Sequence, residues 1–522
     1  MATMAYGYVS VDRSNQFLLP PDVRDWLPPS HLAWFVIDVV ERLDTSALHA
    51  RHRNDGVGRR AYDPDMLLAL VIYAYCTGER SSRQIERRCE LDVAYRVIAA
   101  NHAPDHTTIA RFRQDHDAHA RRLFVDVLEL CATAGLASVG VVAVDGTKMA
   151  ADASMKAIRN RADLEREVAT LFDDAKAKDD DEDRRFGAGR GDELPDDLAD
   201  PSRRRARLDA ALAVLEARAA ARRDTEQAAQ AARRQVAASA HTPGFPHGRI
   251  PSSAEGVAEA EARLAARLAA DRARFEAWQE RRRQAQAAGR RGVTGRRPGE
   301  SDQTKRARTA LANVVAAAAR AERREAKDDK VNLTDPDSRL VKTTSGIVWG
   351  YNAQAAVNTS GIVLAAELTQ QANDQRQLIP MVAATQANLA TVGVTEPIGV
   401  MLFDGGYLSE DNLTTPGPDR LVATTKSHKL RRAAKKDGFA TGDPPPGASP
   451  IEAMEHRLRT EEGMALYTLR QHTVEPVFGT IKAARGFRRF TRRGYVAARA
   501  EWQLITATHN IAKLHRSGFV IV

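Results

Sequence analysis

Apolar residues recur at helical spacing in several short segments of the first part of the chain, between residues 60 and 115. In "YDPDMLLALVIYAYCTG", Asp63 is a typical N-cap before Pro64, and the apolar run that follows is long enough to be buried. The segments "SSRQIERRCELD" and "DHTTIARFRQDH" also begin with capping residues, a serine in one and Asp105 in the other. This pattern predicts a bundle of short helices over residues 1–135.

Short runs of β-branched and apolar residues predict a sheet after this bundle. Val139 to Val144 indicate a short buried strand, which we expect to end at Asp145 and Gly146. The stretch "GIVWGYNAQAAVNTSGIVLAAEL" predicts a hairpin. The stretch "PIGVMLFDGGY" predicts a second buried strand that ends at Asp404, and "RLVATT" predicts a third.

A long helical pattern separates the first strand from the hairpin. Residues 156–330 are rich in Ala, Arg and Glu, and their leucines recur at intervals of three, four and seven, which predicts antiparallel coiled-coil-like arms. The order strand, helical insert, hairpin, helix, strand, strand, helices is typical of an α/β domain split by an insertion. We therefore predict an N-terminal helical domain (1–135), an α/β domain in two parts (136–155 and 331–522) and an insertion between them (156–330).

Composition favours a polyanionic partner. The chain has 522 residues, a net charge of +9 and 63 Arg against 14 Lys, a ratio that a codon-biased genome also produces. Three cysteines are too few for a disulfide framework, and no apolar stretch reaches the roughly 18 residues of a membrane span, so we expect a soluble intracellular protein. A zinc site formed by Cys89, His102, His106, His116 and His119 is a weaker alternative, because no pair has the spacing of a structural site.

Two aspartates share one local pattern, an apolar strand followed by Asp and Gly, in "VVAVDG" at Asp145 and "VMLFDGG" at Asp404. Neighbouring parallel strands would place both carboxylates side by side, where they need a cation such as Mg²⁺. Glu475 is the single acid among eight Lys and Arg residues between Arg470 and Arg499, which makes it the candidate third ligand of a two-metal site. Each acid alone is more often a turn residue or a surface ion pair.

Arginines near the predicted helix starts suggest a helix-turn-helix bundle that binds DNA, and the alternative is an ordinary bundle with solvated arginines. The candidate DNA contacts of this bundle are Arg83, Arg87, Arg111 and Arg113. A second basic tract follows Glu475, and its arginines are predicted to bind the phosphate backbone. The candidate contacts of this tract are Arg485, Arg488, Arg489, Arg492 and Arg493.

The stretch "YTLRQHTVEPVFGTIK" resembles the Tyr, Arg, Glu, Lys signature of bacterial insertion-sequence transposases of the DDE class, with Tyr467, Arg470, Glu475 and Lys482 at the signature positions. Four residues separate Arg470 from Glu475, where the best-known version of the signature has three. The stretches "VDGTKMAADAS", "VNLTDPDSRLVKT" and "FDGGYLSEDNL", and the N-terminal helical region, also resemble this family.

The resemblance implies an RNase H-like catalytic fold in which Asp145, Asp404 and Glu475 are catalytic and hold two Mg²⁺ ions, with Mn²⁺ as the alternative ion. It implies that Tyr467, Arg470 and Lys482 contact the transposon end near the cleaved phosphate. The expected protein binds terminal inverted repeats in double-stranded DNA, cleaves at the element ends and joins the 3′-OH ends to target DNA.

Such a protein would act as a homodimer or higher assembly on DNA, in the bacterial cytoplasm at the nucleoid, without a membrane partner. Two alternatives stay open at this point. One is a transposase-derived DNA-binding protein that is catalytically inactive, and the other is a metal-dependent nuclease that cuts without joining.

Overall fold

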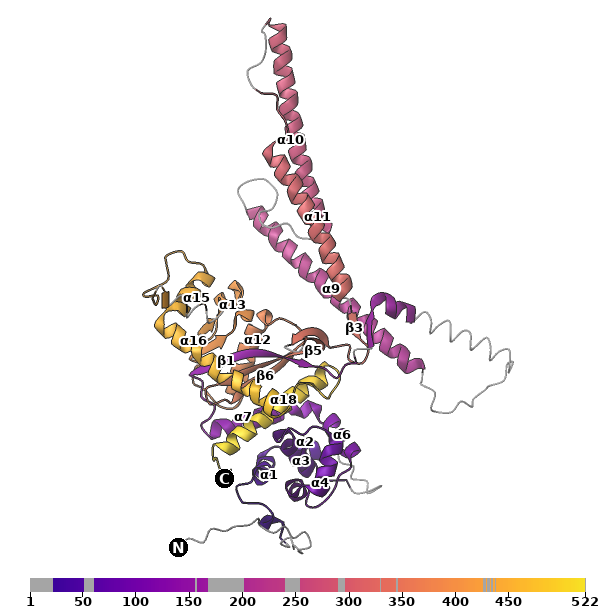
Figure 1. Cartoon of the computed structure of the whole chain (residues 1–522), viewed down its shortest axis with the longest axis vertical. Coiled ribbons are helices and arrows are strands. Elements are labelled where there is room, and N and C mark those ends of the chain that lie inside the picture. The colour runs from indigo at the N-terminus through magenta and orange to yellow at the C-terminus, as the bar shows by residue number, and fades with distance from the viewer. Residues whose placement is uncertain are drawn as a thin grey trace, which may run out of the picture. The chain divides into compact units, whose positions relative to one another are not determined.

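The computed structural model describes residues 22–50, 61–154, 157–167, 201–239, 254–289, 296–328, 330–343, 346–425, 429, 432, 435–436 and 438–521. The chain forms two compact units, one made of Met1–Ala153 and Asp337–Val522 and the other of Ser154–Pro336. The first unit is a mixed α/β structure with one large sheet, and the second is mostly helical (Figure 1). No helix in the described part of the chain is long and apolar enough to cross a membrane.

Short helices make up the start of the first unit. They are η1 (Val23–Asp25), α1 (Leu32–Arg42), α2 (Ser46–His49), α3 (Pro64–Cys76), α4 (Ser82–Leu91), α5 (Val93–Ile98), α6 (His106–Asp115), η2 (Asp117–His119) and α7 (Ala120–Thr133). The predicted helix starts are confirmed. Asp63 caps α3, Ser81 caps α4 at 3.4 Å from the Gln84 N–H, and Asp105 accepts the N–H groups of two threonines at the start of α6.

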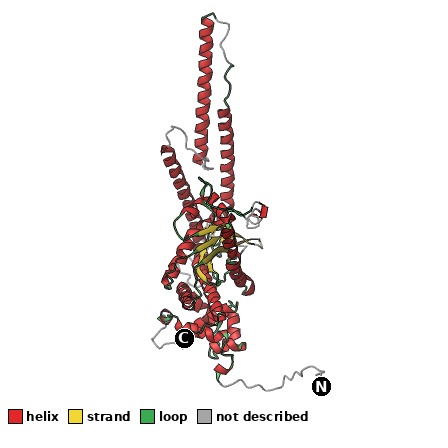
Figure 2. Ribbon diagram, turned by 90° about the vertical axis from the view of Figure 1, so that its left-hand side faces the viewer, coloured by secondary structure: helices red, strands yellow, loops and turns green. Residues whose placement is uncertain are grey.

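A mixed sheet forms the centre of the first unit (Figure 2). Its strands are β1 (Val141–Ala150), β4 (Arg339–Thr343), β5 (Gly346–Asn358), β6 (Val363–Thr369), β7 (Val400–Phe403) and β8 (Arg420–Val422). One edge of β5 pairs antiparallel with β4 and then with β6, and its other edge pairs antiparallel with β1. The strands β1, β7 and β8 are parallel neighbours in that order. The predicted hairpin is therefore β5–β6. The two strands predicted after it are β7 and β8, and both run parallel to β1.

The first strand is longer than its sequence pattern predicts. The pattern predicts an end at Asp145 and Gly146, but β1 continues to Ala150 because β5 pairs with it along its whole second half, with Asp145 opposite Ala355 and Lys148 opposite Asn352. Only the parallel ladder with β7 stops early, at Val144 opposite Phe403. Hydrogen bonding to a long antiparallel neighbour therefore extends the strand through a polar stretch that has no apolar alternation.

Helices cover the sheet. They are η4 (Gln375–Gln377), α12 (Leu378–Thr391), η5 (Gly405–Tyr407), α13 (Glu410–Thr414), α15 (Pro450–Arg459), α16 (Glu461–Thr473), α17 (Glu475–Gly479), η6 (Thr480–Ala484) and α18 (Tyr495–Arg516). The last helix, α18, packs against β6, α7 and α3 (Figure 1). Its Trp502 is fully buried, stacks on Phe478 and donates a hydrogen bond to the Gln354 carbonyl at 3.0 Å. Through Phe478 and Gln354, Trp502 therefore connects α17, the helix that begins at Glu475, to β5.

The second unit contains β2 (Ile158–Asn160), α9 (Pro201–Ser239), α10 (Ala254–Ala287), α11 (Asp302–Asp328) and β3 (Lys330–Asn332). The helices α10 and α11 pack together, as predicted for paired arms. In contrast, Leu208 and Leu215 of α9 are buried against Leu164 and Val331, beside the short β2–β3 ribbon. The leucine spacing of α9 therefore marks a small local core in place of a coiled-coil seam.

Candidate active site

The two predicted aspartates lie at the same edge of the sheet. Val144 and Phe403 are partners in the parallel β1–β7 ladder, and the residues that follow them are Asp145 and Asp404. Asp404 caps η5, because its Oδ1 accepts the Gly406 N–H at 2.8 Å. Neighbouring parallel strands end at a common edge, so the sheet itself places these two acids side by side.

A bend in the C-terminal helices brings Glu475 toward the same edge. The helix α16 ends at Thr473, and α17 begins at Glu475 with Pro476 in its first turn, as the proline predicts. Arg470 of α16 joins the acids: its Nη2 lies 2.6 Å from Asp145 Oδ2, and its Nη1 lies 3.9 Å from Glu475 Oε1. The side chain of Glu475 is 52% exposed, whereas that of Asp145 is 18% exposed.

The electrostatics of the site centre on Asp145. Burial raises the pKa of this carboxyl to about 6, Arg470 opposes the rise, and the negative charge of Asp404 adds to it. Such a carboxyl is short of positive charge even with its arginine partner. A cation bound beside it would lower this pKa.

The donor set fits a divalent cation, since three carboxylates from β1, the end of β7 and α17 converge on one edge. Among the described residues, however, their oxygen atoms do not all lie within 4.8 Å of one another. The guanidinium of Arg470 lies between Asp145 and Glu475 and supplies the positive charge there. We therefore expect Arg470 to release Asp145 when a metal ion is held there.

The raised pKa of Asp145 predicts a specific pH dependence of stability. Between pH 4 and 6 the folded protein keeps this proton while the unfolded chain, with a pKa of about 3.9, has lost it, so stability falls as pH rises through this window. Relative to Asp145→Asn, the free energy of unfolding of the wild type should fall by roughly 2 kcal/mol from pH 4 to pH 7. Denaturant unfolding of both proteins measures this difference, and a difference independent of pH would contradict it.

Of the two other signature residues, Tyr467 lies close to the acids and Lys482 contacts the backbone of β1. Tyr467 is buried in the core next to Arg470, and burial raises its pKa to about 12. Lys482 lies in the π-helical turn η6, where its Nζ donates to the Lys148 carbonyl at 2.8 Å, and burial lowers its pKa. Turns of this kind are frequent at functional sites. Contact of either residue with DNA stays a prediction.

The basic tract after Glu475 divides into buried and exposed members. Arg485 is a correction to the predicted DNA contacts, because its guanidinium is buried and donates to the Tyr75 carbonyl at 2.7 Å and to Ile505 and Thr508. The sequence did not reveal this, since a core arginine and a surface arginine look alike in a basic run. Arg488 and Arg489 are exposed.

The remaining arginines of the tract have acidic partners. Arg492 forms two hydrogen bonds to Asp117 at 2.8 and 2.7 Å, and Arg493 lies 2.8 Å from Asp152. Arg493 is still largely exposed, whereas Arg492 is mostly covered. Arg493 therefore stays available to a phosphate at the surface, and Arg492 has a structural partner.

The predicted contacts in the N-terminal helices also divide. Arg83, Arg87 and Arg111 are exposed. An open groove between the starts of α4 and α6 is lined by Ser81, Ser82, Arg83, His106, Thr107, Ala110, Arg111 and Gln114. Arg113 does not line this groove and donates to the Arg80 carbonyl and the Ser82 hydroxyl, both at 2.8 Å. The geometry therefore leaves Arg83 and Arg111 facing a groove and gives Arg113 an internal role.

A fourth acid, which was not predicted from the sequence, lies next to the site. Asp374 accepts hydrogen bonds from Lys148, Asn352 and Gln354, and its charge contributes to the raised pKa of Asp145. A signal was present in the sequence: Asn352 and Gln354 are polar residues at alternate positions of the mostly apolar, buried part of β5. Buried amides at such positions need a partner.

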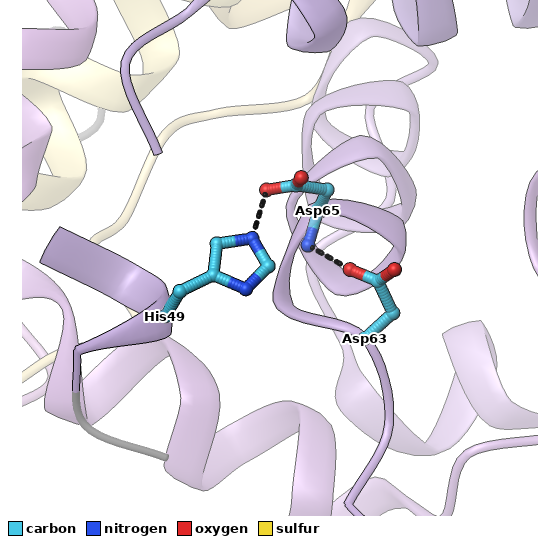
Figure 3. Close-up of side chains that lie close together, drawn as sticks. All are labelled: His49, Asp63 and Asp65. Carbon is cyan, nitrogen blue, oxygen red and sulfur yellow. Dashed lines mark hydrogen bonds and ion pairs between the residues drawn. The ribbon is translucent and has the colours of Figure 1, made fainter. Parts of the chain in front are cut away.

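One group of metal-type ligands occurs away from the acids, among the described residues of the N-terminal helices (Figure 3). His49 Nε2 lies 3.1 Å from Asp65 Oδ1, while Asp63 Oδ1 accepts the Asp65 N–H at 2.8 Å as the cap of α3. Capping and ion pairing account for these contacts. His106 of the proposed zinc alternative instead has its Nδ1 2.8 Å from Glu86 Oε2.

Comparison with known proteins gives two matches. Residues 21–115 match a family described as a transposase domain, and residues 447–515 match a family described as a transposase DDE domain. The second match contains Arg470, Glu475 and Lys482, whereas Asp145 and Asp404 lie outside both matches. No curated protein and no solved structure matches the chain.

Proposed function

The two domain matches support an insertion-sequence DDE transposase, and from that premise we propose that the chain binds the terminal inverted repeats of its element, cleaves the phosphodiester bond at each end and joins the freed 3′-OH to target DNA. The observation that carries this proposal is the meeting of Asp145 and Asp404 on neighbouring parallel strands, with Arg470 linking Asp145 to Glu475. The antiparallel hairpin beside the parallel β1–β7–β8 group also supports an RNase H-like catalytic fold.

DDE transposase domains use divalent metal ions, and we propose that Asp145, Asp404 and Glu475 hold two Mg²⁺ ions, or Mn²⁺ as the alternative. Bound ions of this kind activate the attacking oxygen and stabilise the leaving one. The chain's own residues supply the rest. The arginines at the surface hold the phosphate backbone, and Arg470, once it leaves Asp145, is placed to donate two parallel hydrogen bonds to a phosphate.

The test uses the protein with labelled duplexes that carry the DNA flanking its gene, Mg²⁺ and a plasmid target. The proposal expects imperfect inverted repeats in that flanking DNA, cleavage at their ends and joined products. Binding without cleavage would identify an inactive DNA-binding derivative, and cleavage without joined products would identify a nuclease. Because two ends must meet, we expect the active complex on double-stranded DNA to be a homodimer or a higher assembly, which sizing of the protein–DNA complex measures.

The exposed arginines of the C-terminal tract predict a salt effect. Replacing Arg488 and Arg489 by alanine should weaken binding to all duplexes and reduce the slope of log affinity against log salt by roughly 2, because each phosphate contact releases a counterion. The matched control is replacement of Arg376 and Arg516, which are exposed outside the tract. Equal slopes for the two double variants would place the tract outside the DNA interface.

A further inference from the structure

The acid Asp374 is the centre of a polar network inside the first unit. Its Oδ1 accepts from Asn352 Nδ2 at 2.6 Å, from Gln354 Nε2 at 2.7 Å and from Lys148 Nζ at 3.1 Å. Gln354 in turn accepts the hydroxyl of Tyr407, which is fully buried. We call Lys148, Asn352, Gln354, Asp374 and Tyr407 the Asp374 network.

This network touches both segments that carry the predicted aspartates. On the β1 side, a Cβ atom on Gly146 would collide with Gln354 Nε2 and Asp374 Oδ1, so the residue after Asp145 must be glycine while the network is in place. On the β7 side, Tyr407 ends the turn that Asp404 caps, and a Cβ on Gly406 would lie 3.5 Å from Asp374 Oδ2. The network therefore fixes the backbone directly after each aspartate.

The network lies on the other face of β1 from Asp145. Gly146 and Lys148 pair with Gln354 and Asn352, whereas Asp145 pairs with Ala355, and successive residues of a strand point to opposite faces. Asp374 is the N-cap residue of η4 but makes no capping hydrogen bond. Its carboxylate instead accepts hydrogen bonds from side chains of the sheet strands β1 and β5. The side chains of Asp374 and Lys148 are each 18% exposed, which makes their ion pair a largely desolvated one.

We propose that Asp374 is a positioning residue of the active site. Through Lys148, Asn352, Gln354 and Tyr407 it holds the Gly146 and Gly405–Tyr407 segments in a fixed relation, and this sets the spacing of Asp145 and Asp404. The proposal rests on the function proposed above. Residues that orient metal ligands from behind typically change metal affinity by 10- to 100-fold when they are replaced.

The test measures Mn²⁺ binding by isothermal titration, together with the midpoint of thermal unfolding, for full-length variants. Asp374→Asn should weaken Mn²⁺ binding about tenfold or more, as the outer-shell range indicates, while DNA binding without metal stays unchanged. The control for the loss of one negative charge is Glu396→Gln, at an exposed acid outside the network. Unchanged Mn²⁺ affinity in Asp374→Asn, with a loss only in the unfolding midpoint, would overturn the proposal.

Lys148→Met separates positioning from direct ligation. Removing a positive charge near the site should by itself tighten cation binding, and it would free Asp374 if that acid were a ligand. The proposal expects the opposite, a weakening in the same direction as Asp374→Asn, and tighter binding would overturn it. Asp404→Asn distinguishes failure of the metal site from failure of the positioning role. If this variant binds Mn²⁺ as well as the wild type does, the proposed metal site is wrong. The positioning role of Asp374 is then wrong as well.

Discussion

Asp404→Asn should leave a folded protein that binds its DNA but cleaves and joins it at least about 10³-fold more slowly, a loss of about 4 kcal/mol of transition-state stabilisation. The loss should be chemical, because asparagine has the shape of aspartate and its Oδ1 can still accept the Gly406 N–H that now caps η5. The substitution removes one negative charge at the end of β7, where a metal ion would be held. Single-turnover cleavage of labelled element ends measures the effect.

A matched control for this variant is Asp411→Asn, at an exposed acid in α13 close to Asp404 in the chain. The control should keep wild-type cleavage and show that a change of net charge is not sufficient. Asp145→Asn and Glu475→Gln should behave like Asp404→Asn, since each removes one carboxylate of the same set. Cleavage that survives in Asp404→Asn would remove this acid from the catalytic set and leave the predicted site without its central pair.

The sequence predicts the end of β7 but not the end of β1, and the reason is physical. Asp404 follows a short apolar run, so the end of β7 can be predicted from the local sequence, and so can the helix bend at Pro476. The extension of β1 beyond Asp145 is set by pairing with β5, a strand about 200 positions later in the chain, which no local pattern reports.

The basic residues show the same limit. A run of arginines predicts a DNA-binding surface from its charge, but charge does not say which members face inward. Arg485 is buried because Tyr75 of α3 and Thr508 of α18 present oxygen atoms to it, and Tyr75 lies 410 positions away in the chain. Arg113 is held in the same way by Arg80 and Ser82. Whether a polar side chain is buried depends on its tertiary hydrogen-bond partners, and these can be identified only in the folded structure.

Arg470→Met should separate two properties of the site that the wild type holds together. The arginine is 13% exposed and its partner Asp145 is 18% exposed, so removing it leaves a largely buried carboxylate without its cation and should cost about 3 kcal/mol of stability. The same change removes the positive charge that lies between Asp145 and Glu475. Where the Asp145 carboxyl is ionised, Mn²⁺ should therefore bind at least about tenfold more tightly. Cleavage should nevertheless fall by about 100-fold, because a guanidinium donor to the phosphate is lost.

The double variant Arg470→Met with Asp145→Asn tests the physical cause. If the instability of the single variant comes from the unpaired carboxylate, removing that charge should restore most of the lost stability, and the coupling energy from the double-mutant cycle should be about 1 to 3 kcal/mol. Arg470→Lys is the control that keeps one positive charge but cannot form two parallel hydrogen bonds, so its stability should lie between wild type and Arg470→Met. Wild-type stability and wild-type Mn²⁺ affinity in Arg470→Met would show that the contact with Asp145 has no energetic weight, and Arg470 would then act on DNA alone.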